Sequence, residues 1–258
     1  MISMGPIPAS LRALLANLID YAGLYPPASL ALPAVLDRYR RFLASPESWI
    51  LNRLVLPAAK LAETPLEAGW RVTLLVDDEP GPLPEAVETL ETKRTQRLSL
   101  PTYCEAPLAE IRNAYAKVRT GGLTPETIPS SADLAAFLCS AAARRTPFKA
   151  TAGLHHPVRS LQALTYADDS PRAPMHGFLN VFCAAALVYH GTDQSCVTGL
   201  LEETDPAALE FDDAGFAWQG HRLTASQIDS ARREFAHSFG SCSFEEPIDG
   251  LRELGLLL

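Results

Sequence analysis

Hydrophobic and polar positions along the chain follow two different periods. Short segments bounded by Pro, Gly, Asp or Glu have strand-like composition and alternation, at residues 53–57, 71–77, 97–105, 115–122 and 148–153. Between them, apolar residues recur at helical spacing, at residues 33–43, 84–94 and 130–145. The step from one strand to the next is roughly twenty to thirty residues, which is the βα rhythm of a parallel sheet.

Two α/β layouts satisfy this rhythm. We favour a closed (β/α)₈ barrel of the TIM-barrel type, formed as a single domain over residues 1–258, and the alternative is an open doubly wound parallel sheet. The barrel needs three more strands, predicted at residues 18–24, 176–182 and 239–244, although 176–182 also fits a helix. No Gly-x-Gly-x-x-Gly turn follows any strand, so a dinucleotide-binding fold has no support.

Two segments interrupt the alternation. Residues 158–175 are rich in Asp, Ser and Pro, and predict either a lid loop over the barrel mouth or a helix with a surface loop. Residues 208–223 predict an extra β-hairpin that turns at 212–215. Neither segment has the composition of a linker, so one domain remains the expectation.

Composition narrows the class of protein. The chain of 258 residues is 47% hydrophobic and carries a net charge of −8, which argues against nucleic acid as a partner. Five scattered cysteines form no Cys-x-x-Cys pair, so we expect free thiols in the cytoplasm and no structural zinc. The longest apolar stretch, 178–189, is too short to cross a bilayer, so we expect no membrane partner. A homo-oligomer remains open.

Polar side chains share one face on three successive predicted strands. Lys149 lies on the last of them, Lys117 and Arg119 on the one before, and Glu105 on the first. Charged side chains are unusual inside a barrel. In this fold they usually belong to a functional site at the carboxyl ends of the strands. The alternative is a buried salt-bridge network. Three cations against one anion leave a positive surplus, which predicts a bound phosphate or carboxylate.

Lys149 is the leading catalytic candidate. Crowding by cations and desolvation both disfavour its protonated form, and a neutral lysine forms a Schiff base with a carbonyl compound. Glu105 would then move protons and Lys117 would tune Lys149, while Arg119 binds the anionic group. Further predicted members of the substrate pocket are Thr120, Gly121, Gly122, Thr151, His155, Asn180, Ser241 and Ser243.

The segment FKATAG, residues 148–153, resembles the VKTSTG strand of the deoxyribose-phosphate aldolases. The resemblance implies a (β/α)₈ class I aldolase that acts without a cofactor and forms its Schiff base on Lys149. That family also has a second, activating lysine on the strand after the motif. Here the second lysine, Lys117, lies on the strand before it.

Two other functions remain open. His155, Glu105 and Asp77 follow predicted strands and could hold a divalent metal for hydrolase, isomerase or lyase chemistry. Alternatively, the cations could bind a small anionic metabolite without catalysis. The sequence therefore predicts a small anionic metabolite as the partner, and a lyase of the aldolase type as the leading function.

Overall fold

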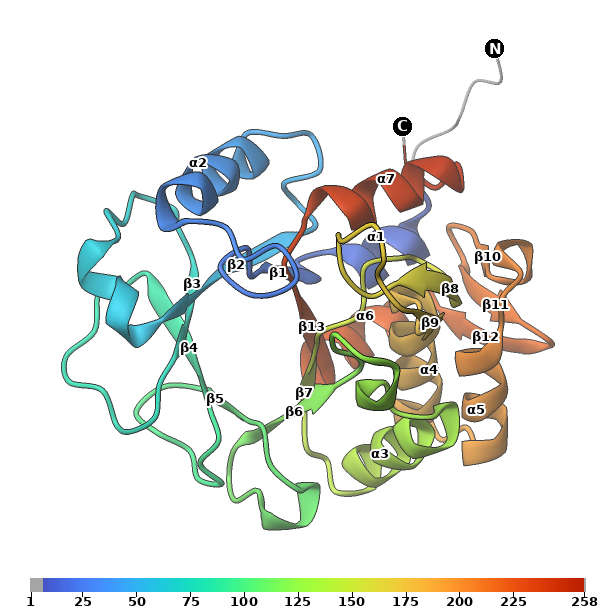
Figure 1. The fold of residues 1–258 in the computed structure, drawn as a ribbon. Coiled ribbons are helices and arrows are strands. Elements are labelled where there is room, and N and C mark those ends of the chain that lie inside the picture. The colour runs from blue at the N-terminus through green and yellow to red at the C-terminus, as the bar shows by residue number, and fades with distance from the viewer. Residues whose placement is uncertain (1–6, 258) are drawn as a thin grey trace.

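The computed structural model describes residues 7–257, and its centre is a closed barrel of eight parallel strands (Figure 1). Around the barrel the order is β1–β13–β7–β6–β5–β4–β3–β2. The strands are β1 (Ile19–Tyr21), β2 (Leu51–Pro57), β3 (Val72–Leu75), β4 (Val87–Thr92), β5 (Thr102–Cys104), β6 (Tyr115–Arg119), β7 (Phe148–Thr151) and β13 (Ala236–Ser241). The single-domain barrel is confirmed over the open sheet.

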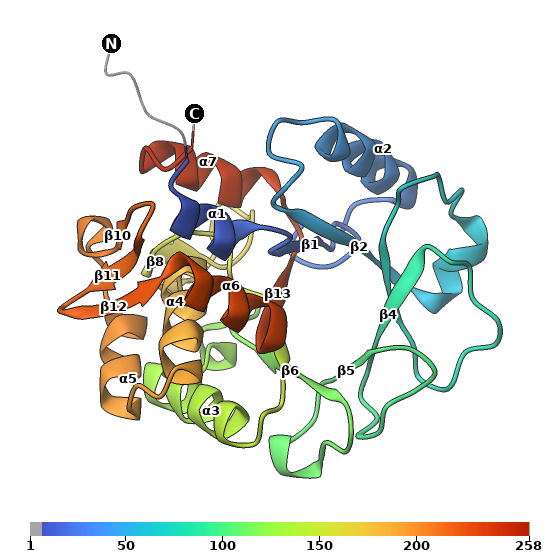
Figure 2. The same ribbon diagram turned by 180° about the vertical axis from the view of Figure 1, so that it is seen from behind.

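The outer layer of helices is uneven (Figures 1 and 2). Its α-helices are α1 (Ala9–Leu15), α2 (Leu32–Leu43), α3 (Ser131–Ala143), α4 (Phe178–Tyr189), α5 (Gln194–Glu202), α6 (Ala225–Glu234) and α7 (Glu245–Glu253). From β2 to β6, the successive strands are joined by loops and by the short 3₁₀ turns η1 (Ala58–Glu63) and η2 (Leu108–Glu110), without an α-helix. Beyond β6 lie η3 (Pro125–Thr127) and η4 (Pro206–Ala208). One half of the barrel is therefore covered by helices and the other half by irregular chain.

Local sequence explains where the helices form. In α2, Val35, Leu36, Tyr39 and Phe42 make a buried stripe at helical spacing. In contrast, α4 is buried on nearly every side, because α3, α5 and α6 pack around it together with β13. A helix that is apolar all round is expected only where other elements enclose it.

Two predicted elements are wrong in type. Residues 84–94, predicted as a helix, contain strand β4, in which Val87 and Thr89 supply the β-branched side chains that favour extended chain. Residues 176–182, predicted as the seventh strand, belong mostly to helix α4, because an unbroken apolar run has no period that separates buried strand from buried helix. The predicted strands 18–24 and 239–244 overlap β1 and β13.

The two interrupting segments both contain antiparallel strands. Residues 158–175 form a hairpin of β8 (Ser160–Ala163) and β9 (Arg172–Met175), and the helix considered there is absent. Residues 208–223 supply β10 (Glu210–Phe211), β11 (Gly215–Trp218) and most of β12 (His221–Thr224), one strand more than the predicted hairpin. In the described part of the chain, no helix has the length and hydrophobicity that a membrane span requires.

Candidate active site at the carboxyl ends of the strands

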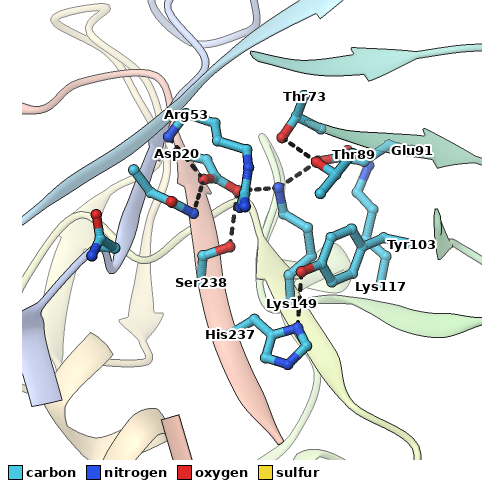
Figure 3. Close-up of polar contacts among 12 residues, drawn as sticks. Asp20, Arg53, Thr73, Thr89, Glu91, Tyr103, Lys117, Lys149, His237 and Ser238 are labelled. Atoms are coloured by element: carbon cyan, nitrogen blue, oxygen red, sulfur yellow. Dashed lines mark hydrogen bonds and ion pairs between the residues drawn. The ribbon is translucent and has the colours of Figure 1, made fainter. Parts of the chain in front are cut away.

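Inside the barrel, six charged side chains alternate in sign along a continuous chain of contacts. The Lys149 ammonium group donates to the carboxylates of Asp20 and Glu91 (Figure 3). Lys117 Nζ lies 2.8 Å from Glu91 Oε2 and 2.9 Å from Glu105 Oε2. Arg119 Nη2 lies 2.9 Å from Glu105 Oε1. We call this set of six, Asp20, Lys149, Glu91, Lys117, Glu105 and Arg119, the charge ladder.

Strand register explains why the two lysines meet. Lys117 on β6 and Lys149 on β7 are paired in the parallel ladder, so their side chains enter the barrel at the same height. Glu91 on β4 reaches both ammonium groups, one with each carboxylate oxygen. The charge ladder thus runs from the closed interior at Asp20 to the mouth at Arg119, whose side chain is about half exposed.

Asp20 closes the buried end of the charge ladder. Besides Lys149, its carboxylate accepts from Asn52 Nδ2 at 2.7 Å, from the Arg53 backbone N–H at 3.2 Å and from Ser238 Oγ at 2.9 Å. The residue is 1% exposed. These donors satisfy the oxygens of the buried carboxylate without water.

The pKa of Lys149 is shifted in the direction opposite to the prediction. Burial by itself would lower the pKa of Lys149, but the carboxylates of Asp20 and Glu91 outweigh it and raise that pKa above the ordinary value. Burial would also raise the pKa of Glu91, yet Lys149 and Lys117 lower it to about 2. Lys149 is therefore a fixed cation at neutral pH, not the neutral amine that cation crowding predicted.

The predicted surplus of positive charge is also wrong. The sequence pattern predicted three cations with Glu105 as the only anion. With Asp20 and Glu91, the charge ladder has three cations and three carboxylates. These six formal charges balance, so the charge ladder does not itself require a bound anion.

A cavity of about 670 Å³ lies over the charge ladder, at the carboxyl ends of the strands. This is where (β/α)₈ enzymes hold their active sites. Six of the predicted site residues line it: Glu105, Lys117, Arg119, Gly122, Thr151 and His155. Lys149 lies beneath this wall, behind Glu91, with 1% of its side chain exposed.

Other predicted site residues hold neighbouring backbone segments of the barrel together. They are not among the described residues that line the cavity. The Thr120 hydroxyl donates to the Ala152 carbonyl at 2.5 Å. A Cβ at Gly121 would come within 2.8 Å of Gly153 Cα, so glycine here permits close packing of two loops. Asn180 accepts from the Arg159 backbone and donates to two carbonyls near the end of α5.

Ser241, at the end of β13, and Ser243, just after it, bond to nearby backbone or helix groups. Ser241 Oγ accepts from the Ser243 backbone N–H at 3.4 Å, and Ser243 Oγ accepts from the Glu246 N–H at 3.2 Å. Ser243 thus helps to start helix α7, as Ser and Thr commonly do at helix N-termini. Neither serine is among the described residues that line the cavity.

The residues of the metal alternative do not converge. Asp77 is exposed and is not among the described residues of the cavity wall, whereas Glu105 is occupied by Lys117 and Arg119. His155 Nδ1 contacts Glu246. Over residues 7–257 no group of three or more His, Cys, Asp or Glu side chains is arranged to hold a metal ion.

Sequence reasoning missed several residues of the site. Glu91 was assigned to a predicted helix, and Asp20, on the predicted strand 18–24, could reach the mouth but was not predicted as the partner of Lys149, 129 positions away. Tyr25, Lys93 and Cys242 also line the cavity from loops that follow strands. The β-branched residues of VETLET, residues 87–92, were the signal that could have placed Glu91 on a strand.

Comparison of the chain with protein-family models, with curated proteins and with solved structures gave no match.

Proposed function

We propose that this protein is an enzyme that makes or breaks a carbon–carbon bond in a small carbonyl compound through a Schiff base on Lys117. The observation that carries the proposal is the shared carboxylate of Glu91, which holds Lys117 at the cavity wall and Lys149 beneath it. A (β/α)₈ barrel is compatible with an enzyme of the aldolase type.

Access favours Lys117 over Lys149 as the nucleophile. Lys117 lines the cavity, and 9% of its side chain is exposed. Lys149 is enclosed by Asp20 and Glu91 and stays protonated at neutral pH. Glu91 shares its two carboxylate oxygens between Lys149 and Lys117, and so holds the Lys117 amine at the cavity wall, where it can reach a carbonyl carbon.

This assignment exchanges the roles predicted for the two lysines. With Lys117 as the nucleophile, the activating lysine lies on the strand that follows, β7, which is the order in the deoxyribose-phosphate aldolases that FKATAG resembles. The resemblance by itself implies the Schiff base on Lys149, the lysine of FKATAG, so the choice of Lys117 rests on the access of its side chain to the cavity and not on the motif.

The reaction steps use contacts already present. Lys117 passes a proton to Glu105, whose carboxylate lies 2.9 Å away, and the amine attacks the carbonyl carbon. The carbonyl oxygen leaves as water, and the protonated imine accepts the electron pair of the neighbouring carbon–carbon bond when that bond breaks. Arg119 and Lys93 at the cavity wall are the candidates to bind a phosphate or carboxylate on the substrate.

Borohydride trapping tests the proposal. The chain has only four lysines, at 60, 93, 117 and 149, so the adduct can be assigned by mass spectrometry. With a panel of small aldehydes and ketones, with and without phosphate or carboxylate groups, we expect an adduct on Lys117. Lys117→Met should abolish it, whereas Lys60→Met, which is not among the described residues that line the cavity, should keep it.

The outcomes separate the alternatives. An adduct on Lys149 would retain Schiff-base chemistry but overturn our choice of nucleophile. No lysine adduct, with turnover lost to a chelator, would favour metal chemistry. Retention of a ligand without turnover would favour a binding protein.

Tyr25 is the best candidate to donate a proton to substrate. Its hydroxyl is buried at the cavity and has no hydrogen-bond partner among residues 7–257. Burial, and then the charge of Glu91, raises the pKa of Tyr25, so the hydroxyl keeps its proton. An unpaired buried hydroxyl is a cost that a substrate oxygen would remove.

We expect Tyr25→Phe to lower kcat/KM for the trapped compound by about 10²-fold without lowering stability. Tyr21→Phe is the matched control, because the Tyr21 hydroxyl is also buried without a partner but is not among the described residues that line the cavity. Steady-state kinetics and thermal unfolding measure both effects. Equal rates for the two variants would remove Tyr25 from the mechanism.

A further inference from the structure

A second cluster of reactive groups lies on the same cavity, apart from the charge ladder. Cys242 follows β13 and lines the cavity, with its Sγ 4.0 Å from His155 Nε2. The other ring nitrogen, His155 Nδ1, lies 2.5 Å from Glu246 Oε2 in the first turn of α7. The Tyr166 hydroxyl lies 3.8 Å from Cys242 Sγ.

This order of groups is the arrangement that activates a thiol. A nucleophile needs a base within reach, and the base needs a third group that orients it. Glu246 orients the imidazole through Nδ1, which leaves Nε2 directed at the sulfur. Neither the sequence motifs nor the proposed Schiff-base chemistry uses Cys242 or Glu246.

We propose that Cys242 is a nucleophilic thiolate, paired with the His155 imidazolium and oriented by Glu246, that adds to the carbonyl carbon of an aldehyde in the cavity. The sulfur–carbon bond forms as the carbonyl π bond breaks. The oxygen takes the proton from His155 Nε2, and the product is a thiohemiacetal. No oxidant, reductant or leaving group is needed.

The protonation state of the histidine agrees with this pairing. Burial alone would lower the pKa of His155, but its contacts with Cys242 and Glu246 raise that pKa to about 9. The imidazole is therefore charged at neutral pH. Other titratable groups around the cluster are Tyr166, which contacts Cys242 and Glu246, Tyr21, which faces Cys242, and His156, whose pKa is lowered by burial and then by His155.

The remaining cysteines supply internal controls. Cys104 and Cys183 are buried, and burial raises the pKa of both. Cys139 is half-buried, with its pKa raised by burial and by Asp193. Cys196 does lie 3.2 Å from His221 Nε2, but it is not among the described residues of the cavity.

Alkylation of the whole protein by iodoacetamide, read for each cysteine by mass spectrometry between pH 6 and 9, tests the thiolate. At pH 7 we expect Cys242 to react about tenfold faster than Cys139, because His155 Nε2 lies beside its sulfur, whereas burial and Asp193 raise the pKa of Cys139. His155→Gln should reduce the rate to that of Cys139, and Glu246→Gln should reduce it partly. Continued protection of Cys104 and Cys183 shows that each variant is folded.

The wild-type pH profile provides a test that needs no variant. If the contact with His155 activates the sulfur, Cys242 keeps its reactivity toward iodoacetamide at pH 6, whereas Cys139, whose pKa is raised by burial and by Asp193, loses it there. A Cys242 rate that matches Cys139 at every pH, or that is unchanged in folded His155→Gln protein, overturns the proposal.

Glycolaldehyde tests the carbonyl ligand. In Lys117→Met protein, which lacks the competing amine, we expect glycolaldehyde to slow alkylation of Cys242 and to leave Cys139 unaffected. Equal slowing of both cysteines, or of neither, would show that the thiol does not take up an aldehyde. Because the readout is the thiol itself, it is independent of whether Lys117 forms a Schiff base.

Discussion

Replacement of Lys149 by methionine is expected to lower the free energy of unfolding by about 3–5 kcal/mol at pH 7. The ammonium group is buried and contacts the carboxylates of both Asp20 and Glu91. Without it, two buried anions lose their shared cation, and the energetic cost of an unpaired buried charge is large. Urea unfolding of the wild type and the variant measures the difference.

Arg119→Met is the control for this experiment. Arg119 is the cation at the other end of the charge ladder, and 51% of its side chain is exposed. Its ion pair with Glu105 is screened by water, so we expect a loss of less than about 1 kcal/mol. A Lys149→Met loss no greater than that of Arg119→Met would show that the buried end of the charge ladder does not stabilise the fold.

The barrel was predictable because its strands are short and clearly bounded. Residues 115–122 and 148–153 have Lys117 and Lys149 on matching faces, and that correctly predicted that the two side chains enter one interior. Parallel strands on adjacent positions of a barrel place such residues at a common height. The position of the cavity at the carboxyl ends followed from the same argument.

The charge partners were not predictable, for a physical reason. Glu91 lies in a segment whose apolar residues fit a helix as well as a strand, and only the tertiary fold decides between them. The direction of the Lys149 pKa depends on how many carboxylates surround it. Because Glu91 was not recognised as a strand residue facing Lys149, the sequence predicted a neutral lysine where the folded protein holds a cation.

Replacement of Glu91 by glutamine should change how stability depends on pH. The pKa of Glu91 is lowered from 4.5 to about 2, so its charge stabilises the folded protein fully above about pH 5. That contribution is lost as the pH falls through 2. At pH 7 we expect Glu91→Gln to cost about 3 kcal/mol, near the low end for a broken buried pair, because each lysine keeps one carboxylate partner.

Between pH 5 and pH 2 the difference between the wild type and Glu91→Gln should shrink, because the wild type then protonates the same carboxylate. Glu88 on the same strand is the matched control, since it bridges Arg53 and Arg71 as Glu91 bridges two lysines, yet its side chain is 34% exposed. Glu88→Gln should cost only about 1 kcal/mol. Acid unfolding curves that keep a constant separation between wild type and Glu91→Gln would contradict the lowered pKa, and with it the view that Glu91 is the anion that holds both lysines.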